Sequence, residues 1–167
     1  MREVAKLLND MVSHGVISAY AVFVAVAQMR YTEAVSTMDA DVLVSVNAGD
    51  RIDMLSSIYS FCLERGYKPE GEAIQVGDWP VQFIPAYDAL TEEAMREAEA
   101  ADMEGVPLNV VSASHLAVIA LKTGRAKDHL RILALIESGA VNPDHIKQVA
   151  TRHQLDAKWA DFRAKFL

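Results

Sequence analysis

Thr37-Met38-Asp39-Ala40-Asp41-Val42-Leu43-Val44 is the stretch of sequence that decides the predicted fold. Its apolar residues alternate with other residues, which predicts a β-strand over residues 39–46. Asp39 and Asp41 lie two residues apart at the start of that strand, so their carboxylates project from the same face. With a rise of about 3.3 Å per residue, their Cβ atoms are roughly 6–7 Å apart. The two carboxylates can therefore share one or two cations.

This spacing suits a hard divalent cation. Mg²⁺ prefers oxygen ligands and commonly uses one or two carboxylates together with substrate phosphates. Cations held in this way orient an attacking oxygen and stabilise a leaving pyrophosphate. Asp-x-Asp by itself also occurs at solvated strand ends and in turns. The interpretation therefore depends on the elements around the pair.

The sequence around the pair predicts alternating helices and strands. Before it we expect a helix over 2–14, a strand over 19–24, a short helix over 25–31 and a loop over 32–38. After it we expect a helix from Asp50 to Gly66, strands over 72–76 and 81–84 joined by Gly77-Asp78, a helix from Thr91 to about Ala101, and a strand over 106–111. This part of the chain is therefore expected to form a mixed α/β core.

From Ser114 onward the pattern is helical. Helices are expected over 115–123 and 126–137, then from Asn142-Pro143 and from Asp156. We therefore divide the chain into an α/β core, residues 1–114, and a helical C-terminal subdomain, residues 115–167. We expect the subdomain to pack on the core as one compact unit.

Composition sets limits on the class of protein. The chain has 167 residues, of which 51% are hydrophobic, enough for one domain with a real core. The single cysteine, Cys62, cannot form an internal disulfide, and the apolar runs are shorter than the roughly 18 residues of a membrane span. A cytoplasmic protein without a membrane segment is the expectation.

Charge is unevenly spread along the chain. The net charge is −7, with 7 basic and 18 acidic residues up to residue 114, and 9 basic and 5 acidic residues after it. The acidic part argues against broad nucleic-acid binding, which needs a surface that neutralises phosphates. The basic part leaves room for a local phosphate partner, such as a nucleotide or an RNA end. Solvated basic helices would explain the same charge.

Taken together, these elements resemble the nucleotidyltransferase superfamily. The resemblance covers residues 1–90 best, through the apolar run Ala19-Tyr20-Ala21-Val22-Phe23-Val24-Ala25-Val26-Ala27 followed by Thr37, Asp39 and Asp41. It is similar to the branch of minimal nucleotidyltransferases and AbiE-type toxins. The resemblance implies an α/β (α+β) fold, with a mixed β-sheet flanked by helices and a C-terminal helical tail. It also implies transfer of a nucleotidyl group from an NTP to a hydroxyl.

The resemblance also implies a set of site residues. Asp39 and Asp41 would be catalytic and would hold Mg²⁺ or Mn²⁺, and the NTP would lie near Thr37, Val24 and Ala25. Further along the chain, Lys122 and Lys127 would meet triphosphate oxygens, and Asp128 would orient a lysine or assist at the site, because family members often have a lysine on one helix and a basic-Asp element on the next. The alternative is that they are exposed helix residues, with Asp128 favoured near a helix N-terminus by the helix dipole.

Two positions depart from the family pattern. Phe23-Val24 stands where the family has Gly-Gly or Gly-Ser, whose backbone N–H groups approach phosphates. Gln82 stands where full members have an acid that serves as general base, and an amide cannot take up a proton. Ala25 or a shifted register is a candidate substitute for the glycine, and Glu72 and Asp88 are candidates for the acid, although no spacing selects them.

Three functions follow from these observations. The first is an Mg²⁺-dependent nucleotidyltransferase whose acceptor is a small molecule, a protein or an RNA end. The second is a nucleotide-binding or protein-interaction module with weakened chemistry. The third is a toxin that modifies RNA, with an antitoxin partner. Outside this site we interpret the five histidines as helix-end or surface residues, and Glu92, Glu93, Glu97 and Glu99 as a solvated face.

Overall fold

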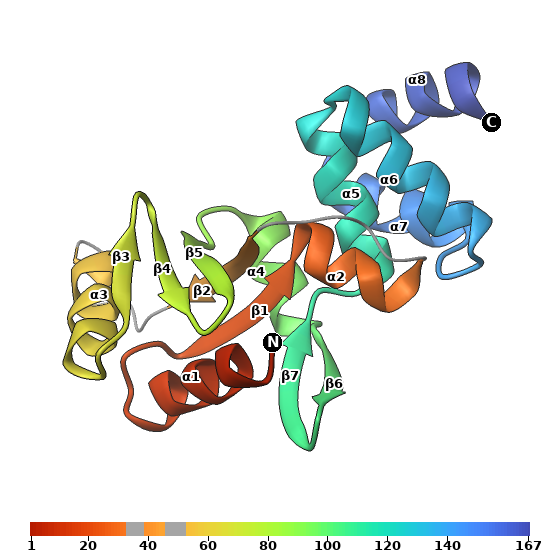
Figure 1. Cartoon of the computed structure of the whole chain (residues 1–167). Helices are drawn as coiled ribbons and strands as arrows, with labels where there is room; N and C mark the ends of the chain where they lie inside the picture. The colour runs from red at the N-terminus through yellow and green to blue at the C-terminus, as the bar shows by residue number, and fades with distance from the viewer. Residues whose placement is uncertain (33–38, 46–52) are drawn as a thin grey trace.

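The computed structural model describes residues 1–32, 39–45 and 53–167 (Figure 1). The first elements are α1 (Arg2–Ser13), β1 (Ala19–Phe23), α2 (Val24–Tyr31), β2 (Ala40–Ser45) and α3 (Met54–Glu64). There follow β3 (Lys68–Glu70), β4 (Ala73–Val76), β5 (Trp79–Pro85), α4 (Ala89–Arg96), β6 (Glu99–Met103) and β7 (Val106–Val110). The tail contains α5 (Ala113–Thr123), α6 (Ala126–Glu137), α7 (Pro143–Arg152) and α8 (Asp156–Phe166).

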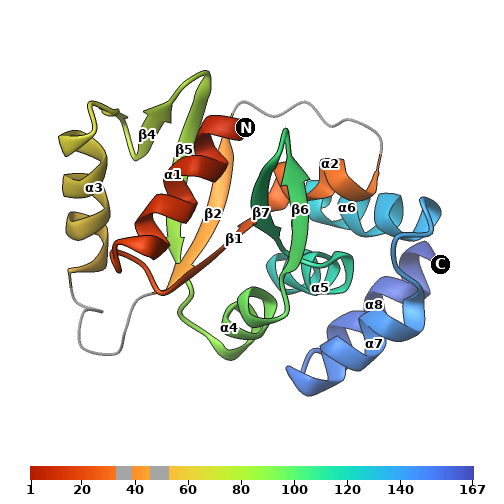
Figure 2. The same cartoon turned by 90° about the horizontal axis from the view of Figure 1, so that it is seen from below.

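The strands form one mixed, seven-stranded sheet in the order β3-β4-β5-β2-β1-β7-β6. In its centre β2 runs antiparallel to β1 and parallel to β5, while β1 runs parallel to β7. The α5–α8 helices gather beyond α2 at one side of the sheet, and α3 lies at the other side, beside β3 (Figures 1 and 2). The predicted fold class, a mixed sheet flanked by helices with a helical tail, is confirmed.

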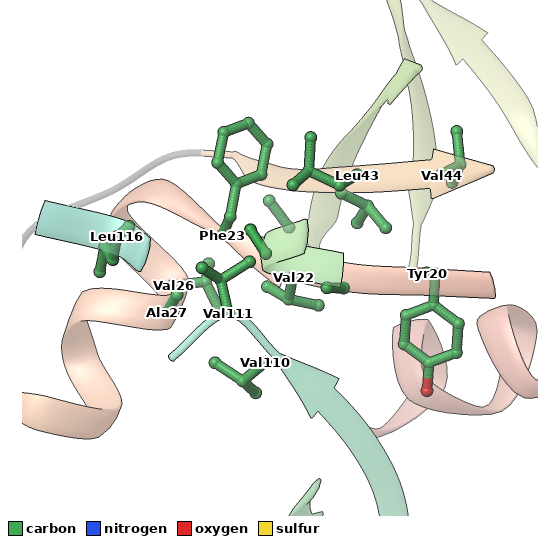
Figure 3. Packing of buried hydrophobic residues seen from close by; sticks show 14 of the residues in the cluster. Tyr20, Val22, Phe23, Val26, Ala27, Leu43, Val44, Val110, Val111 and Leu116 are labelled. Atoms are coloured by element: carbon green, nitrogen blue, oxygen red, sulfur yellow. The ribbon is translucent and has the colours of Figure 1, made fainter. Parts of the chain in front are cut away.

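The core explains why β1 and β2 are central. Val22 of β1 is paired with Val42 of β2 on one side and with Val110 of β7 on the other, and all three are buried. Complete burial of such a side chain contributes about 1.5–3 kcal/mol. Val26 of α2 and Leu116 of α5 are buried in the same cluster (Figure 3). These contacts hold the end of β1, the start of β2 and the tail in fixed relation.

The helix predicted from Thr91 to about Ala101 is wrong at both ends. Asp88 caps α4, because its Oδ1 accepts the Thr91 backbone N–H at 2.8 Å while the Thr91 side chain bonds back to Asp88. After α4 the chain forms β6, which pairs with β7 through a tight turn. Glu104 and Gly105 in that turn have φ values of 53° and 80°, the left-handed backbone that two-residue hairpins favour.

Other boundaries differ less. The short strand β3 was not predicted, since its three residues are all exposed and carry no apolar alternation. Asp53 is the residue before α3, whereas the predicted cap Asp50 lies outside the described residues, as does Thr37. Across the described residues, each helix is too short or too polar to cross a membrane.

Candidate functional site

Asp41 lies at the start of β2, where three strands meet. Its Cα is paired with that of Phe23, the last residue of β1, and with that of Gln82 on β5. Since α2 begins at the residue after Phe23, the acidic pair lies at the same edge of the sheet as the N-terminus of α2. The strand register thus brings Asp41, Gln82 and the β1–α2 junction together.

The neighbour of Asp41 on β5 is the amide Gln82. Residues paired in register on adjacent strands project to the same face of a sheet. Gln82 is half-buried and therefore stands beside Asp41 at the position where an acid was expected from the family pattern. The described site accordingly combines two carboxylates with a neutral amide.

The electrostatics of Asp41 reflect this crowded position. Burial, and then the negative charge of Asp39, raise the pKa of Asp41 from its ordinary value to about 6. Arg131, Lys127 and Arg125 act in the opposite direction and favour the charged carboxylate. Asp41 is thus close enough to Asp39, to Arg125 and to the basic residues of α6 for their charges to act on it.

A hydrogen-bonded network links α6 to α2. Arg131 donates from Nε to Gln28 Oε1 and from Nη1 to Asp128 Oδ1, both at 3.0 Å. Asp128 also accepts from Arg125 Nε at 2.7 Å, and only 1% of its side chain is exposed. Asp128 therefore holds two arginines, and Lys127 remains exposed beside them. Sequence reasoning missed Gln28 and Arg131, because they are 103 residues apart and share no local pattern. It gave no role to Arg125, which stands close to Lys127 and Asp128 in the sequence.

Lys122 has a different neighbour. Its Nζ forms an ion pair with Asp88 Oδ2 at 2.5 Å, at the N-terminus of α4. Burial tends to raise the pKa of Asp88, but the hydrogen bonds from Lys122 and Thr91 outweigh it and lower that pKa. Contact of Lys122 with a phosphate stays a prediction, and such contact would compete with this ion pair.

Solved structures share this arrangement of sheet and helices. No protein-family model matches the sequence, and none of the curated proteins matches it. An antigenic nucleotidyltransferase-like protein from Paracoccidioides brasiliensis superposes with a TM-score of 0.57 at 13% identity, over 94% of this chain and 90% of that one. The solution structure of the antibiotic-resistance factor ANT(2'')-Ia gives a TM-score of 0.53 at 12% identity, over 99% and 98% of the two chains.

The chain has the nucleotidyltransferase fold. At 12–13% identity the likeness concerns the fold. The expected resemblance to this superfamily is confirmed at that level, and the toxin branch stays a prediction.

Within the nucleotidyltransferase fold, the β1–α2 junction has a strained residue. Val24 has a φ of 58°, in the left-handed region that glycine enters freely and a β-branched residue rarely does. It is the first residue of α2, and Phe23 before it provides no side-chain cap. The backbone at Val24 thus has a glycine-like conformation, at the position where the family pattern has glycine.

Val24 gives the first testable prediction. We expect Val24→Gly to be about 1 kcal/mol more stable than Val24→Ala, because left-handed backbone costs an L-residue roughly 1–2 kcal/mol. Both variants lose the valine methyl groups, so alanine is the matched control for packing. The measurement is the free energy of unfolding in urea. An alanine variant as stable as the glycine variant would show that residue 24 does not have left-handed backbone.

A second group of ionisable residues lies at the junction of α4 with the tail. Glu93 is buried and accepts hydrogen bonds from His115 Nε2 at 3.1 Å, His153 Nε2 at 2.8 Å and Arg152 Nε at 3.0 Å. The prediction of a solvated Glu93 is therefore wrong, and of the two alternatives for His115, helix end or surface, the structure gives the helix end, since His115 is buried in the first turn of α5. Glu93 lies on the apolar stripe of α4, three residues after Leu90 and next to Ala94, which is the sequence signal for its burial.

This second group has metal-ligand atoms but a different role in the structure. Ligand atoms of Glu93, Glu97 and His115 lie within 4.8 Å of one another, so a cation can in principle fit there. However, Arg152 and the two histidines already satisfy the Glu93 carboxylate. We interpret the cluster as a joint that ties α4 of the core to α5 and α7.

Proposed function

We propose that this chain binds a nucleoside triphosphate together with Mg²⁺ or Mn²⁺ and transfers a nucleotidyl group to a hydroxyl acceptor. The observation that carries the proposal is the position of Asp41, with Asp39, at the start of the central strand β2 of a nucleotidyltransferase fold. Arg131 and Lys127 of α6, and Arg125 directly before it, act on the same carboxylate. The site therefore offers ligands for a cation and opposite charges for phosphates.

The donor set fits a hard cation. Burial and the adjacent negative charge of Asp39 disfavour the ionised form of Asp41, and a divalent cation between them would relieve that repulsion. Asp39 and Asp41 would hold the ion through carboxylate oxygens, which Mg²⁺ prefers. When bound, such an ion neutralises charge that develops on the phosphate oxygens.

The phosphates of the nucleotide would lie between the cation at the two carboxylates and the basic residues in and directly before α6. Arg125, Lys127 and Arg131 supply positive charge, and guanidinium groups bind phosphate oxygens through paired N–H donors. The backbone N–H groups of Val24 and Ala25 at the N-terminus of α2 would add donors, since a helix N-terminus favours anions. Thr37 and Lys122 belong to the same proposal as further nucleotide-binding residues.

The transfer step conserves atoms and charge. The acceptor oxygen forms a bond to the α-phosphorus, and the bond from that phosphorus to the oxygen bridging to the β-phosphate breaks. Pyrophosphate leaves with the electron pair, and the proton of the acceptor hydroxyl passes to water, because the Gln82 amide cannot accept it. Acceptors of three classes belong to this proposal: a small molecule, a protein or an RNA end, the last in a toxin with an antitoxin partner.

A second candidate function is favoured by Gln82 and Val24. An amide stands beside Asp41 where a base would activate the acceptor, and a valine side chain stands at the N-terminus of α2. The amide and the valine side chain would each slow nucleotidyl transfer more than they weaken nucleotide binding. In that case the chain is a cation-dependent nucleotide-binding module without turnover, or an interaction module of the same fold.

One experiment separates these functions. The chain is incubated with each of the four α-labelled NTPs and Mn²⁺, and both bound nucleotide and released pyrophosphate are measured, with EDTA as the control. Cation-dependent binding with pyrophosphate release supports the transferase. Binding without release supports the nucleotide-binding module. The absence of cation-dependent binding of all four NTPs contradicts both the transferase and the nucleotide-binding module, and leaves the interaction module.

Gln82 gives a second testable prediction. Gln82→Glu adds a third carboxylate beside Asp41, so we expect Mn²⁺ to bind about tenfold more tightly, about 1.4 kcal/mol. The matched control is Gln75→Glu on β4, which makes the same charge change on a strand one place further from β2. The dissociation constant is measured by Mn²⁺ electron paramagnetic resonance. Equal tightening in both variants would show that Gln82 is not beside the cation.

A further inference from the structure

We propose that Gln28 and Asp128 are positioning residues, which hold Arg131 and Arg125 as a fixed pair of guanidiniums for a polyphosphate chain. The inference rests on the proposed function and deepens it, because it says which residues fix the arginines on the phosphate side of that site, and it gives Asp128 two arginines to orient where the family resemblance implies a lysine. It rests on the network between α2 and α6.

Arg131 is the fixed member of the pair. Its side chain is only 9% exposed, which is unusual for a charged residue without a defined purpose. Gln28, itself buried, accepts from Nε, and Asp128 accepts from Nη1. These bonds use two of the five N–H donors of a guanidinium, so the group retains donors for a further acceptor.

Asp128 connects Arg131 to Arg125. It accepts from the Nε of Arg125 at 2.7 Å, from its Nη2 at 3.3 Å and from its backbone N–H at 3.2 Å. The two arginines would otherwise repel each other, and the buried negative charge between them removes that repulsion. Arg125 is 57% exposed and is therefore accessible to a ligand while one carboxylate fixes its orientation.

The network is connected to the proposed cation site through α2, because Gln28 of α2 holds Arg131 and α2 begins directly after Phe23, the residue paired with Asp41. The positive charges of Arg131 and Arg125 act on the Asp41 carboxylate, as does that of Lys127. A chain of phosphates that reaches from a cation at Asp41 to α6 would meet guanidiniums already held in place, which lowers the entropic cost of binding.

Positioning of the arginines by Asp128 and attraction by net charge predict opposite effects of one substitution. If net charge alone governed the affinity for a polyanion, Asp128→Asn would bind it more tightly, because the variant loses a negative charge. If Asp128 positions the arginines, the same variant binds more weakly. The sign of the change therefore distinguishes positioning from general electrostatic attraction.

The test uses inorganic tripolyphosphate in EDTA, measured by calorimetry on the full chain. We expect wild-type binding, a loss of about tenfold in Arg125→Gln, and weaker binding in Asp128→Asn. Lys147→Gln, an exposed residue on α7 with the same charge change, is the control and should stay close to wild type. Gln28→Ala changes no charge and leaves the ion pairs of Asp128 with the two arginines in place. It should also weaken tripolyphosphate binding, and it replaces Asp128→Asn as the test if that variant fails to fold.

The outcomes are separable from those of the proposed function. Asp41→Asn should keep or tighten tripolyphosphate binding in EDTA, since it removes a negative charge, while it loses Mn²⁺-dependent NTP binding. If only the Mn²⁺-dependent binding is missing from the wild type, the proposed function fails and the inference stands. No tripolyphosphate binding by the wild type, wild-type affinity in folded Gln28→Ala, or equal or tighter binding in folded Asp128→Asn would overturn the inference.

Discussion

Asp41→Asn is expected to lower Mn²⁺-dependent nucleotide binding at least about 100-fold and yet to increase the stability of the fold. The loss follows from removal of a carboxylate ligand, and a 100-fold change corresponds to about 2.7 kcal/mol. The gain follows from the environment of Asp41, where burial and Asp39 raise its pKa to about 6. A residue that destabilises the free protein and serves a ligand is typical of a functional site.

The sign of the stability effect is fixed by that pKa. An acid whose pKa is higher in the folded than in the unfolded chain favours folding while protonated, and this advantage is lost as the pH rises from about 4 to about 6. Above that range the ionised Asp41 destabilises the fold, so the neutral asparagine should be more stable at pH 7 by about 1–2 kcal/mol. Below pH 4 the difference should disappear.

Urea unfolding at pH 4 and pH 7, together with nucleotide binding, measures both effects. Asp161→Asn is the matched control, because Asp161 is exposed on α8. It should change neither binding nor stability by a large amount. An Asp41→Asn protein that is less stable than wild type at pH 7 would show that Asp41 has a structural role.

Glu93→Gln is expected to destabilise the fold by about 3 kcal/mol. The buried carboxylate accepts hydrogen bonds from α5 and α7, and replacement by an amide removes the negative charge opposite Arg152 and reduces the number of acceptors. Glu97→Gln on the same helix is the matched control. Its side chain is 51% exposed and lies 3.7 Å from His115, so we expect a change below about 0.5 kcal/mol.

The same joint should give the protein an acid-sensitive stability. Burial alone would raise the pKa of Glu93, but the hydrogen bonds from Arg152, His115 and His153 outweigh it and lower that pKa to about 2. A lowered pKa contributes stability above the ordinary value near 4.5, and this contribution is lost as the pH falls toward 2. Glu93→Gln should therefore lose less stability than wild type between pH 4.5 and pH 2. If the two proteins lost equal stability over this range, the hydrogen bonds to Glu93 would not be the source of the acid sensitivity.

The sequence pattern predicted the centre of the fold because the signals there are local. Alternating apolar residues mark β2, the apolar run before α2 marks β1, and glycines or Asn142-Pro143 mark the helix boundaries of the tail. Asp41 could be placed on β2 for the same reason. The family resemblance puts Gln82 at the position of the third acid, and the strand register pairs Gln82 with Asp41.

The sequence pattern failed where tertiary contacts override local preference. Residues 97–101 are all Glu or Ala, which favour helix, yet residues 99–103 pair with β7 across the turn at Gly105. Glu93 looked solvated because its partners His115, Arg152 and His153 come from distant helices. Likewise, the link from Gln28 to Arg131 joins two helices far apart in sequence.

The most direct test of the central claim is the position of a bound cation. A crystal of the chain with Mn²⁺ and a non-hydrolysable NTP, measured at the manganese absorption edge, would locate the ion by anomalous scattering. We predict an anomalous peak within direct coordination distance of oxygens of both Asp39 and Asp41, with a nucleotide phosphate as a further ligand. A nucleotide bound elsewhere, or manganese found at Glu93 and His115 but not at Asp41, would contradict the claim.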